Sequence, residues 1–76
     1  MSNDQTRGVY TFIQTYAHDH KGLAPSIREI AKGVYLGRST VLRHLDRLEA
    51  WGLIEREPYQ ARSIRLTERS WPRQQE

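Results

Sequence analysis

Residues 26–51 contain two helix signals separated by a turn of a few residues, and this spacing constrains the fold most strongly. Ser26 follows Pro25 and can accept hydrogen bonds from the free amides of the next turn, while Glu29 completes a capping box. The inward face of this first short helix would consist of Ile27, Ile30, Ala31 and Val34. Gly33 weakens the helix, and "GVYLG" predicts a turn that ends at Gly37.

A second helix is predicted from Arg38 to Trp51, with Gly52 as its stop signal. Its apolar positions have the spacing of one helical face: Val41, Leu45 and Leu48. The small side chain of Ala31 allows the two backbones to approach closely. Two helices joined at a steep angle by a short turn form a helix-turn-helix, whose second helix can enter a DNA major groove.

The flanking segments predict one more helix and a hairpin. Before Ser26, apolar and aromatic residues recur at helical spacing (Val9, Phe12, Ile13, Tyr16, Ala17 and His20), and Gly22 can cap that helix. After Gly52, "LIEREP" and "RSIRL" predict two short strands with a hairpin tip at Pro58 to Ala61. In the second strand, Ile64 and Leu66 should point inward, and Ser63 and Arg65 outward.

The predicted order of elements is typical of a mainly α fold with a small β-hairpin, the winged helix-turn-helix. We expect a disordered N-terminus over 1–6, a winged helix-turn-helix DNA-binding domain over 7–67 and a polar tail over 68–76. A chain of 76 residues forms one small domain with a thin core, which leaves little room for an enzyme pocket. We therefore expect no enzymatic activity and no catalytic residues.

Composition narrows the function classes further. Twelve Lys and Arg against nine Asp and Glu give a net charge of +3, which is weak support for a nucleic-acid partner. The chain has no cysteine, and no apolar run approaches the length of a membrane span. We expect a protein of the cytoplasm of a bacterium, an archaeon or a phage-infected cell, associated with the nucleoid when bound, without membrane contact.

Three stretches closely resemble the N-terminal DNA-binding domain of the LexA repressor family: "FIQTYAHDHKGLAPSIREIA", "STVLRHLDRLEAWGLIER" and "ARSIRL". The resemblance covers roughly Val9 to Leu66. It implies a winged helix-turn-helix that represses promoters by binding palindromic operators as a dimer. The family usually has a glycine in the turn where this chain has Tyr35, and a polar residue at the position of Trp51. We expect the family's Ser-Lys self-cleaving domain to be absent from this chain.

The candidate DNA-contacting residues follow from the outward face of the helix 38–51. Its N-terminal turns would go deepest into the groove, so we assign base contacts to Arg38, Ser39, Thr40 and Arg43. We assign contacts with the DNA backbone to the start of the preceding helix, the far end of the second helix and the wing. These residues are Ser26, Arg28, Arg47, Arg62 and Arg65.

Other readings of the same residues remain open. The basic side chains could form a solvated surface, or the domain could be a protein-interaction module or an architectural, excisionase-like DNA binder. His18 and His20 are two positions apart on a helix and point to different faces, so we expect no metal and no cofactor. Trp51 and Trp71 either pack on their neighbours, with Tyr59 or the tail, or contact a partner in a homodimer formed on DNA.

Overall fold

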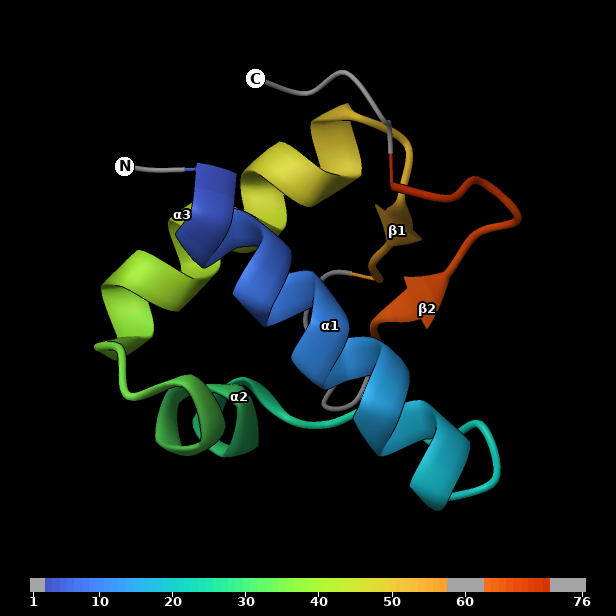
Figure 1. Ribbon diagram of the computed structural model, residues 1–76, viewed down its shortest axis with the longest axis horizontal. Helices are drawn as coiled ribbons and strands as arrows, with labels where there is room; N and C mark the ends of the chain where they lie inside the picture. The colour runs from blue at the N-terminus through green and yellow to red at the C-terminus, as the bar shows by residue number, and fades with distance from the viewer. Residues whose placement is uncertain (1–2, 58–62, 72–76) are drawn as a thin grey trace.

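Three helices and a two-stranded antiparallel hairpin make up the fold (Figure 1). This computed structural model describes residues 3–57 and 63–71. The helices are α1 (Asn3–Asp19), α2 (Ile27–Val34) and α3 (Arg38–Ala50). The strands are β1 (Ile54–Glu55) and β2 (Arg65–Leu66). The winged helix-turn-helix predicted from the sequence is confirmed.

Helix α1 begins earlier than the sequence analysis predicts, because residues 3–6 are helical rather than disordered. The physical reason is tertiary: the Thr6 side chain is fully buried, and a 2.8 Å hydrogen bond joins its Oγ1 to Nδ1 of His44 on α3. The other end of α1 closes as expected for a left-handed cap. Lys21 and Gly22 both have positive φ, and the Gly22 amide donates to the Ala17 carbonyl at 2.7 Å.

Helix α2 starts with the capping box that the sequence predicts. The Ser26 hydroxyl accepts a hydrogen bond from the Glu29 amide at 3.1 Å, and the Ser26 amide donates to Glu29 Oε1 at 2.7 Å. Gly33, in contrast, lies inside α2 and not in the turn. A Cβ atom at Gly33 would sit 2.1 Å from Cε2 of Phe12, so the glycine lets α1 and α2 approach.

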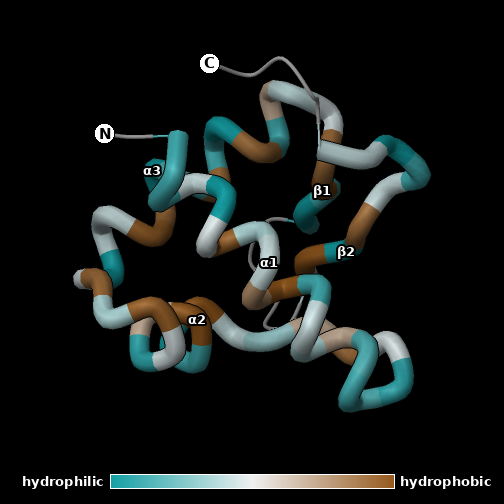
Figure 2. Tube along the Cα trace, in the orientation of Figure 1, coloured by the Kyte–Doolittle hydropathy of each residue, from teal (hydrophilic) through white to brown (hydrophobic). Residues whose placement is uncertain are grey.

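The core fills the space between the helices and β1. Its buried hydrophobic residues come from every helix and from the hairpin: Val9, Tyr10, Ile13, Ala24, Ile30, Val41, Leu45, Leu48, Leu53, Ile54 and Ile64. Figure 2 shows apolar segments alternating with hydrophilic ones along all three helices. The predicted inward positions Val41, Leu45 and Leu48 of α3 are each fully buried, so the spacing identified this face correctly.

The wing is shorter than the two predicted strands. Ile54 pairs with Leu66, and Glu55 pairs with Arg65. Ile64 is buried as predicted, but the prediction for Leu66 is wrong, since 38% of its surface is exposed. Helix α3 packs on β1, and β2 joins the body through β1, so the outer strand receives less cover. The predicted tip, Pro58 to Ala61, lies outside the described residues.

The segment after the wing returns to the body of the protein. The Thr67 amide donates to the Leu53 carbonyl at 3.1 Å, and Trp71 packs against the core. The Trp71 ring lies 5.6 Å from that of Trp51 in an edge-on arrangement and 5.7 Å from the Tyr10 ring. Trp71 is therefore part of the packed body, although the sequence places it in a polar tail over 68–76.

Candidate nucleic-acid interface

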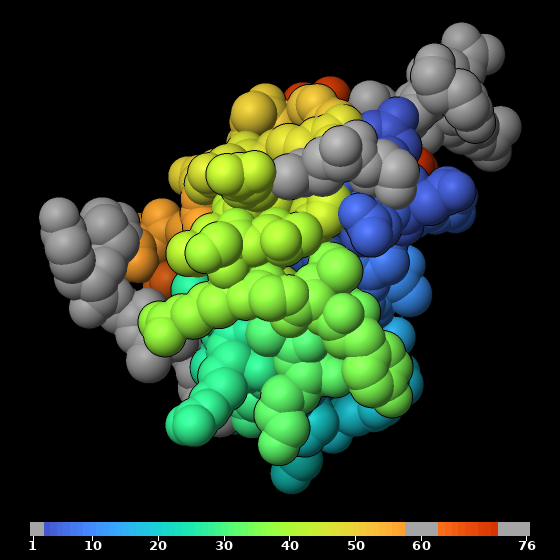
Figure 3. Space-filling view, turned by 90° about the vertical axis from the view of Figure 1, so that its left-hand side faces the viewer, coloured from blue at the N-terminus to red at the C-terminus, as the bar shows by residue number. Residues whose placement is uncertain are grey.

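Helices α2 and α3 lie together on one face of the molecule. Figure 3 views this face, with α2 in green below α3 in yellow-green and side chains projecting from both. Arg38, Ser39 and Arg43 of α3 are exposed, and Thr40 is half-buried. The structure thus places the four predicted base-contacting residues on the first two turns of α3.

Three exposed arginines of α2 and α3 have no acidic partner in the part of the chain that the structure describes. Within the described residues, Arg28, Arg38 and Arg43 form no ion pair or side-chain hydrogen bond. Arg28 is exposed one residue after the start of α2. Their guanidinium groups are therefore available to phosphate oxygens or to the guanine edge, which accepts two parallel hydrogen bonds.

Arg47, which the sequence predicts to contact the DNA backbone, interacts with other residues of the protein. Its Nη2 atom donates to Asn3 Oδ1 at 2.7 Å, and its guanidinium lies 5.1 Å from the Trp51 ring centroid. A cation over an indole face is attracted by the ring's negative face. This arrangement leaves no local signal in the sequence, because Asn3 is remote from Arg47 along the chain.

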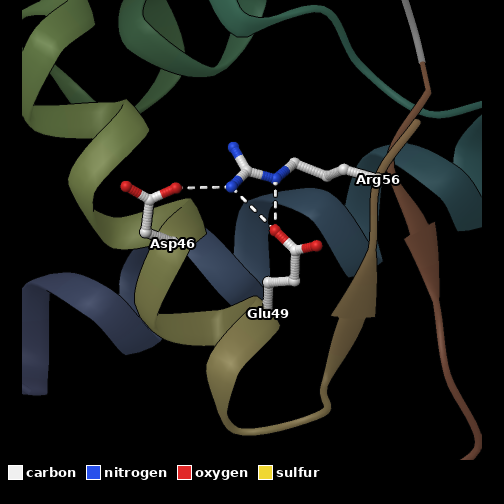
Figure 4. A network of polar contacts seen from close by, with 3 residues as sticks. All are labelled: Asp46, Glu49 and Arg56. Carbon is white, nitrogen blue, oxygen red and sulfur yellow. Dashed lines mark hydrogen bonds and ion pairs between the residues drawn. The ribbon is translucent and has the colours of Figure 1, made fainter. Parts of the chain in front are cut away.

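Arg56 is a residue of this region that the sequence analysis did not single out. Its Nε and Nη2 donate to Oε1 of Glu49 at 3.0 and 2.8 Å, and Nη2 also donates to Asp46 Oδ1 (Figure 4). Burial alone would lower the pKa of Arg56, but its hydrogen bonds and ion pairs with both carboxylates hold that pKa above its ordinary value. The segment after β1 is thereby tied to α3, and two acidic side chains of α3 are neutralised.

Of the two wing residues predicted to contact the DNA backbone, the structure describes Arg65, and it is exposed. Its Nη2 donates to Glu55 Oε1 at 3.0 Å across the two strands. Both side chains are about two-thirds exposed, at 66% and 63%, so solvent screens this pair strongly. Arg62 lies outside the described residues, and its contact with DNA stays a prediction.

His44 supplies a buried polar group between α1 and α3. Its Nδ1 is hydrogen-bonded to Thr6, while its Nε2 is buried and has no hydrogen-bond partner among residues 3–57 and 63–71. Burial, and then the nearby charge of Arg47, lower the pKa of His44 below its ordinary value. The signal was present in the sequence, since position 44 shares the inward helical face with Val41 and Leu48.

The remaining histidines lie apart from this interface. His20 stacks on the Tyr16 ring at 3.8 Å, and His18 contacts Asp19. Over residues 3–57 and 63–71, no three His, Asp or Glu side chains group as a metal site would require. The same residues include no helix long and apolar enough to span a membrane.

Comparison with known proteins decides the family. The family model described as the LexA DNA binding domain matches residues 2–63, which include all three helices and β1. The chain belongs to the LexA DNA-binding domain family. The LexA repressor of Staphylococcus carnosus is 46% identical over 59 residues, covering 76% of this chain and 28% of the relative. That of Clostridium acetobutylicum is 45% identical over 67 residues, covering 87% of this chain and 32% of the relative.

A third LexA repressor, from Oenococcus oeni, is 39% identical over 70 residues, covering 91% of this chain and 32% of the relative. The chain thus spans about a third of the length of the LexA repressors it matches. The family resemblance predicted from the sequence is confirmed. The residues of this chain that match the family model include all of α2 and α3.

Proposed function

We propose that this chain binds double-stranded DNA sequence-specifically, with α3 in the major groove, and represses transcription by occupying promoter DNA. The observation that carries the proposal is the set of unpaired arginines on the helix-turn-helix. Arg28, Arg38 and Arg43 have no acidic partner among the described residues. Unpaired, exposed guanidinium groups on one pair of helices are suited to a polyanion that also presents base edges.

The contacts divide by chemistry. Arg43 can donate two parallel hydrogen bonds to a guanine, and Thr40 can meet a thymine methyl, while Arg38 and Ser39 lie at the end of α3 that enters the groove first. Arg28 and the start of α2 would bind phosphates, as would Arg62 and Arg65 of the wing.

Arg47 would make its proposed phosphate contact only at the expense of its hydrogen bond to Asn3 or its position over Trp51. In the free protein its hydrogen bond to Asn3 joins the start of α1 to α3.

Assembly on DNA belongs to the same proposal. A single winged helix covers about one half-site, and operators with two-fold symmetry are bound by two protomers. We therefore propose that two copies occupy adjacent half-sites as a homodimer formed on the DNA.

Selection of bound duplexes from a random library, at a fixed and stated salt concentration, tests the proposal. We expect enrichment of a short motif that recurs in inverted orientation. Salt-independent or absent binding would instead favour a protein-interaction module. Binding without any enriched motif, together with bending of the duplex, would favour an architectural role.

A further inference from the structure

Tyr35 occupies a backbone conformation that its side chain makes unfavourable. It is the C-cap of α2, with φ 58° and ψ 41°, in the left-handed region. For an aromatic residue this conformation is strained, whereas glycine adopts it freely. The backbone gains its cap hydrogen bond to the Ala31 carbonyl whichever side chain is present.

The Tyr35 side chain contributes little to the fold. It is 92% exposed, the largest exposure among the exposed large hydrophobic residues of the described chain. It makes no ring stacking, hydrogen bond or ion pair with other residues in that part of the chain. A strained backbone that displays a free aromatic side chain suggests a function outside the folded monomer.

The position of Tyr35 indicates which partner would meet this side chain. It lies in the turn between α2 and α3, two residues before the N-cap Gly37. In Figure 1 this turn reaches the left edge of the molecule, and that edge faces the viewer in Figure 3. The turn therefore lies on the face formed by α2 and α3 and leads directly into the first turn of α3, which begins with the unpaired Arg38.

We infer that Tyr35 contacts the sugar–phosphate backbone of the DNA beside the bases read by α3. Its phenol hydroxyl donates a hydrogen bond to a phosphate oxygen, and its ring packs on a deoxyribose. The inference rests on the proposed function. A backbone contact positions α3 in the groove and carries no base preference.

Tyr35→Gly separates this role from a structural one, because it relieves the backbone strain while it removes the contact. We expect a melting temperature equal to or above that of the wild type. Affinity for the duplex recovered by selection should fall about tenfold, because both the hydrogen bond of the hydroxyl and the packing of the ring are lost. Affinity for an unrelated duplex should fall by the same factor. The dependence of affinity on salt should not change, since no charge is removed.

Two further variants sharpen the test. Tyr35→Phe keeps the ring and should lose about threefold in affinity, as removal of the hydroxyl contact alone requires. Lys21→Gly is the matched control: Lys21 also has φ 58° and is exposed, but it follows α1 at the opposite edge of the molecule (Figure 1). This control should relieve similar strain and leave affinity within about twofold of the wild type.

Several results would overturn the inference. If Tyr35→Gly binds the selected duplex as tightly as the wild type does, Tyr35 makes no contact with the DNA, and the proposed function still stands. A melting temperature several degrees lower would make the side chain structural, and wild-type affinity in Tyr35→Phe would exclude the hydroxyl contact. Failure of the wild type to select any duplex would instead refute the proposed function itself.

Discussion

The guanidinium of Arg43 combines exposure with the absence of an acidic neighbour in the described chain. If it donates two hydrogen bonds to one guanine, Arg43→Ala should weaken binding to the selected duplex by about 1–3 kcal/mol. Preference at a single base position should relax at the same time. Binding titrations on duplexes substituted at each position measure both effects. Equal weakening on selected and random duplexes would identify Arg43 as a phosphate contact.

His44 makes the stability of the protein depend on pH. Its pKa is lowered in the folded state by burial and by Arg47, so the unfolded chain binds its proton more readily. As pH falls through the ordinary histidine pKa of about 6.5, the unfolded state gains protons first and the free energy of unfolding decreases. Urea denaturation at a series of pH values from neutral to mildly acidic should show this loss.

The variant His44→Gln tests the assignment, because it keeps a polar group beside Thr6 and cannot titrate. We expect the stability of this variant to vary less with pH over the same interval. His18→Gln is the control for replacement of a histidine by glutamine, since the His18 side chain is 90% exposed. An unchanged pH dependence in His44→Gln would assign the effect to other groups.

At the scale of elements, the packing of α1 on α2 depends on a missing side chain. A Cβ atom at Gly33 would overlap Phe12, so Gly33→Ala should destabilise the fold by about 1–3 kcal/mol, as overpacking does. Gly8→Ala is the matched control, because its helical Cβ would meet no atom within 4 Å, and it should stabilise by up to about 1 kcal/mol. Thermal denaturation compares the two.

Phe12→Leu provides the second half of the Gly33 experiment. The smaller side chain leaves room for the new methyl group. The loss in the free energy of unfolding of the double variant should therefore be smaller than the sum of the losses of the two single variants. Strict additivity of the two substitutions would show that the Phe12 ring and the Cβ at position 33 do not meet.

The connection between the wing and α3 rests on Arg56. Arg56→Gln removes its contacts with Asp46 and Glu49, and we expect a loss of about 1 kcal/mol in the free energy of unfolding. Two acidic side chains of α3 also lose their counter-charge, so DNA affinity should fall for every duplex. Denaturation and titration with selected and unrelated duplexes measure both losses.

Adding Asp46→Asn and Glu49→Gln to Arg56→Gln removes the unbalanced charges. The triple variant should recover most of the lost DNA affinity, although the ties between the wing and α3 are still missing. If the triple variant recovers none of the lost affinity, DNA binding depends on the contacts of Arg56 with Asp46 and Glu49 and not on neutralisation of the two carboxylates.

At the scale of the whole molecule, packing among the described residues covers part of the aromatic surface that a dimer of this chain would use in free solution. Trp51 and Trp71, the aromatic residues considered for a partner contact, are half-buried and pack on each other, and Trp71 also packs on Tyr10. We therefore expect a monomer at micromolar concentration, with cooperative binding to two half-sites about one helical turn apart. Light scattering and titrations over a series of half-site spacings check this. A free dimer, or affinity independent of spacing, would contradict it.

The sequence by itself determined the features that depend on neighbours along the chain. The capping box of Ser26 and Glu29 and the buried face of α3 follow from spacing within short stretches, because helix periodicity and capping are local. The family follows from the resemblance of three stretches, which the family model confirms. The exposed positions of Arg38 and Arg43 follow from the same periodicity.

Only the tertiary structure decided the features that join distant residues. Thr6 meets His44, Asn3 meets Arg47, and the ring of Phe12 occupies the space that a side chain at Gly33 would need. Burial of Thr6 extends α1 to Asn3, and the outer position of β2 leaves Leu66 exposed. No local pattern encodes such contacts, since each depends on how whole helices and strands pack against one another.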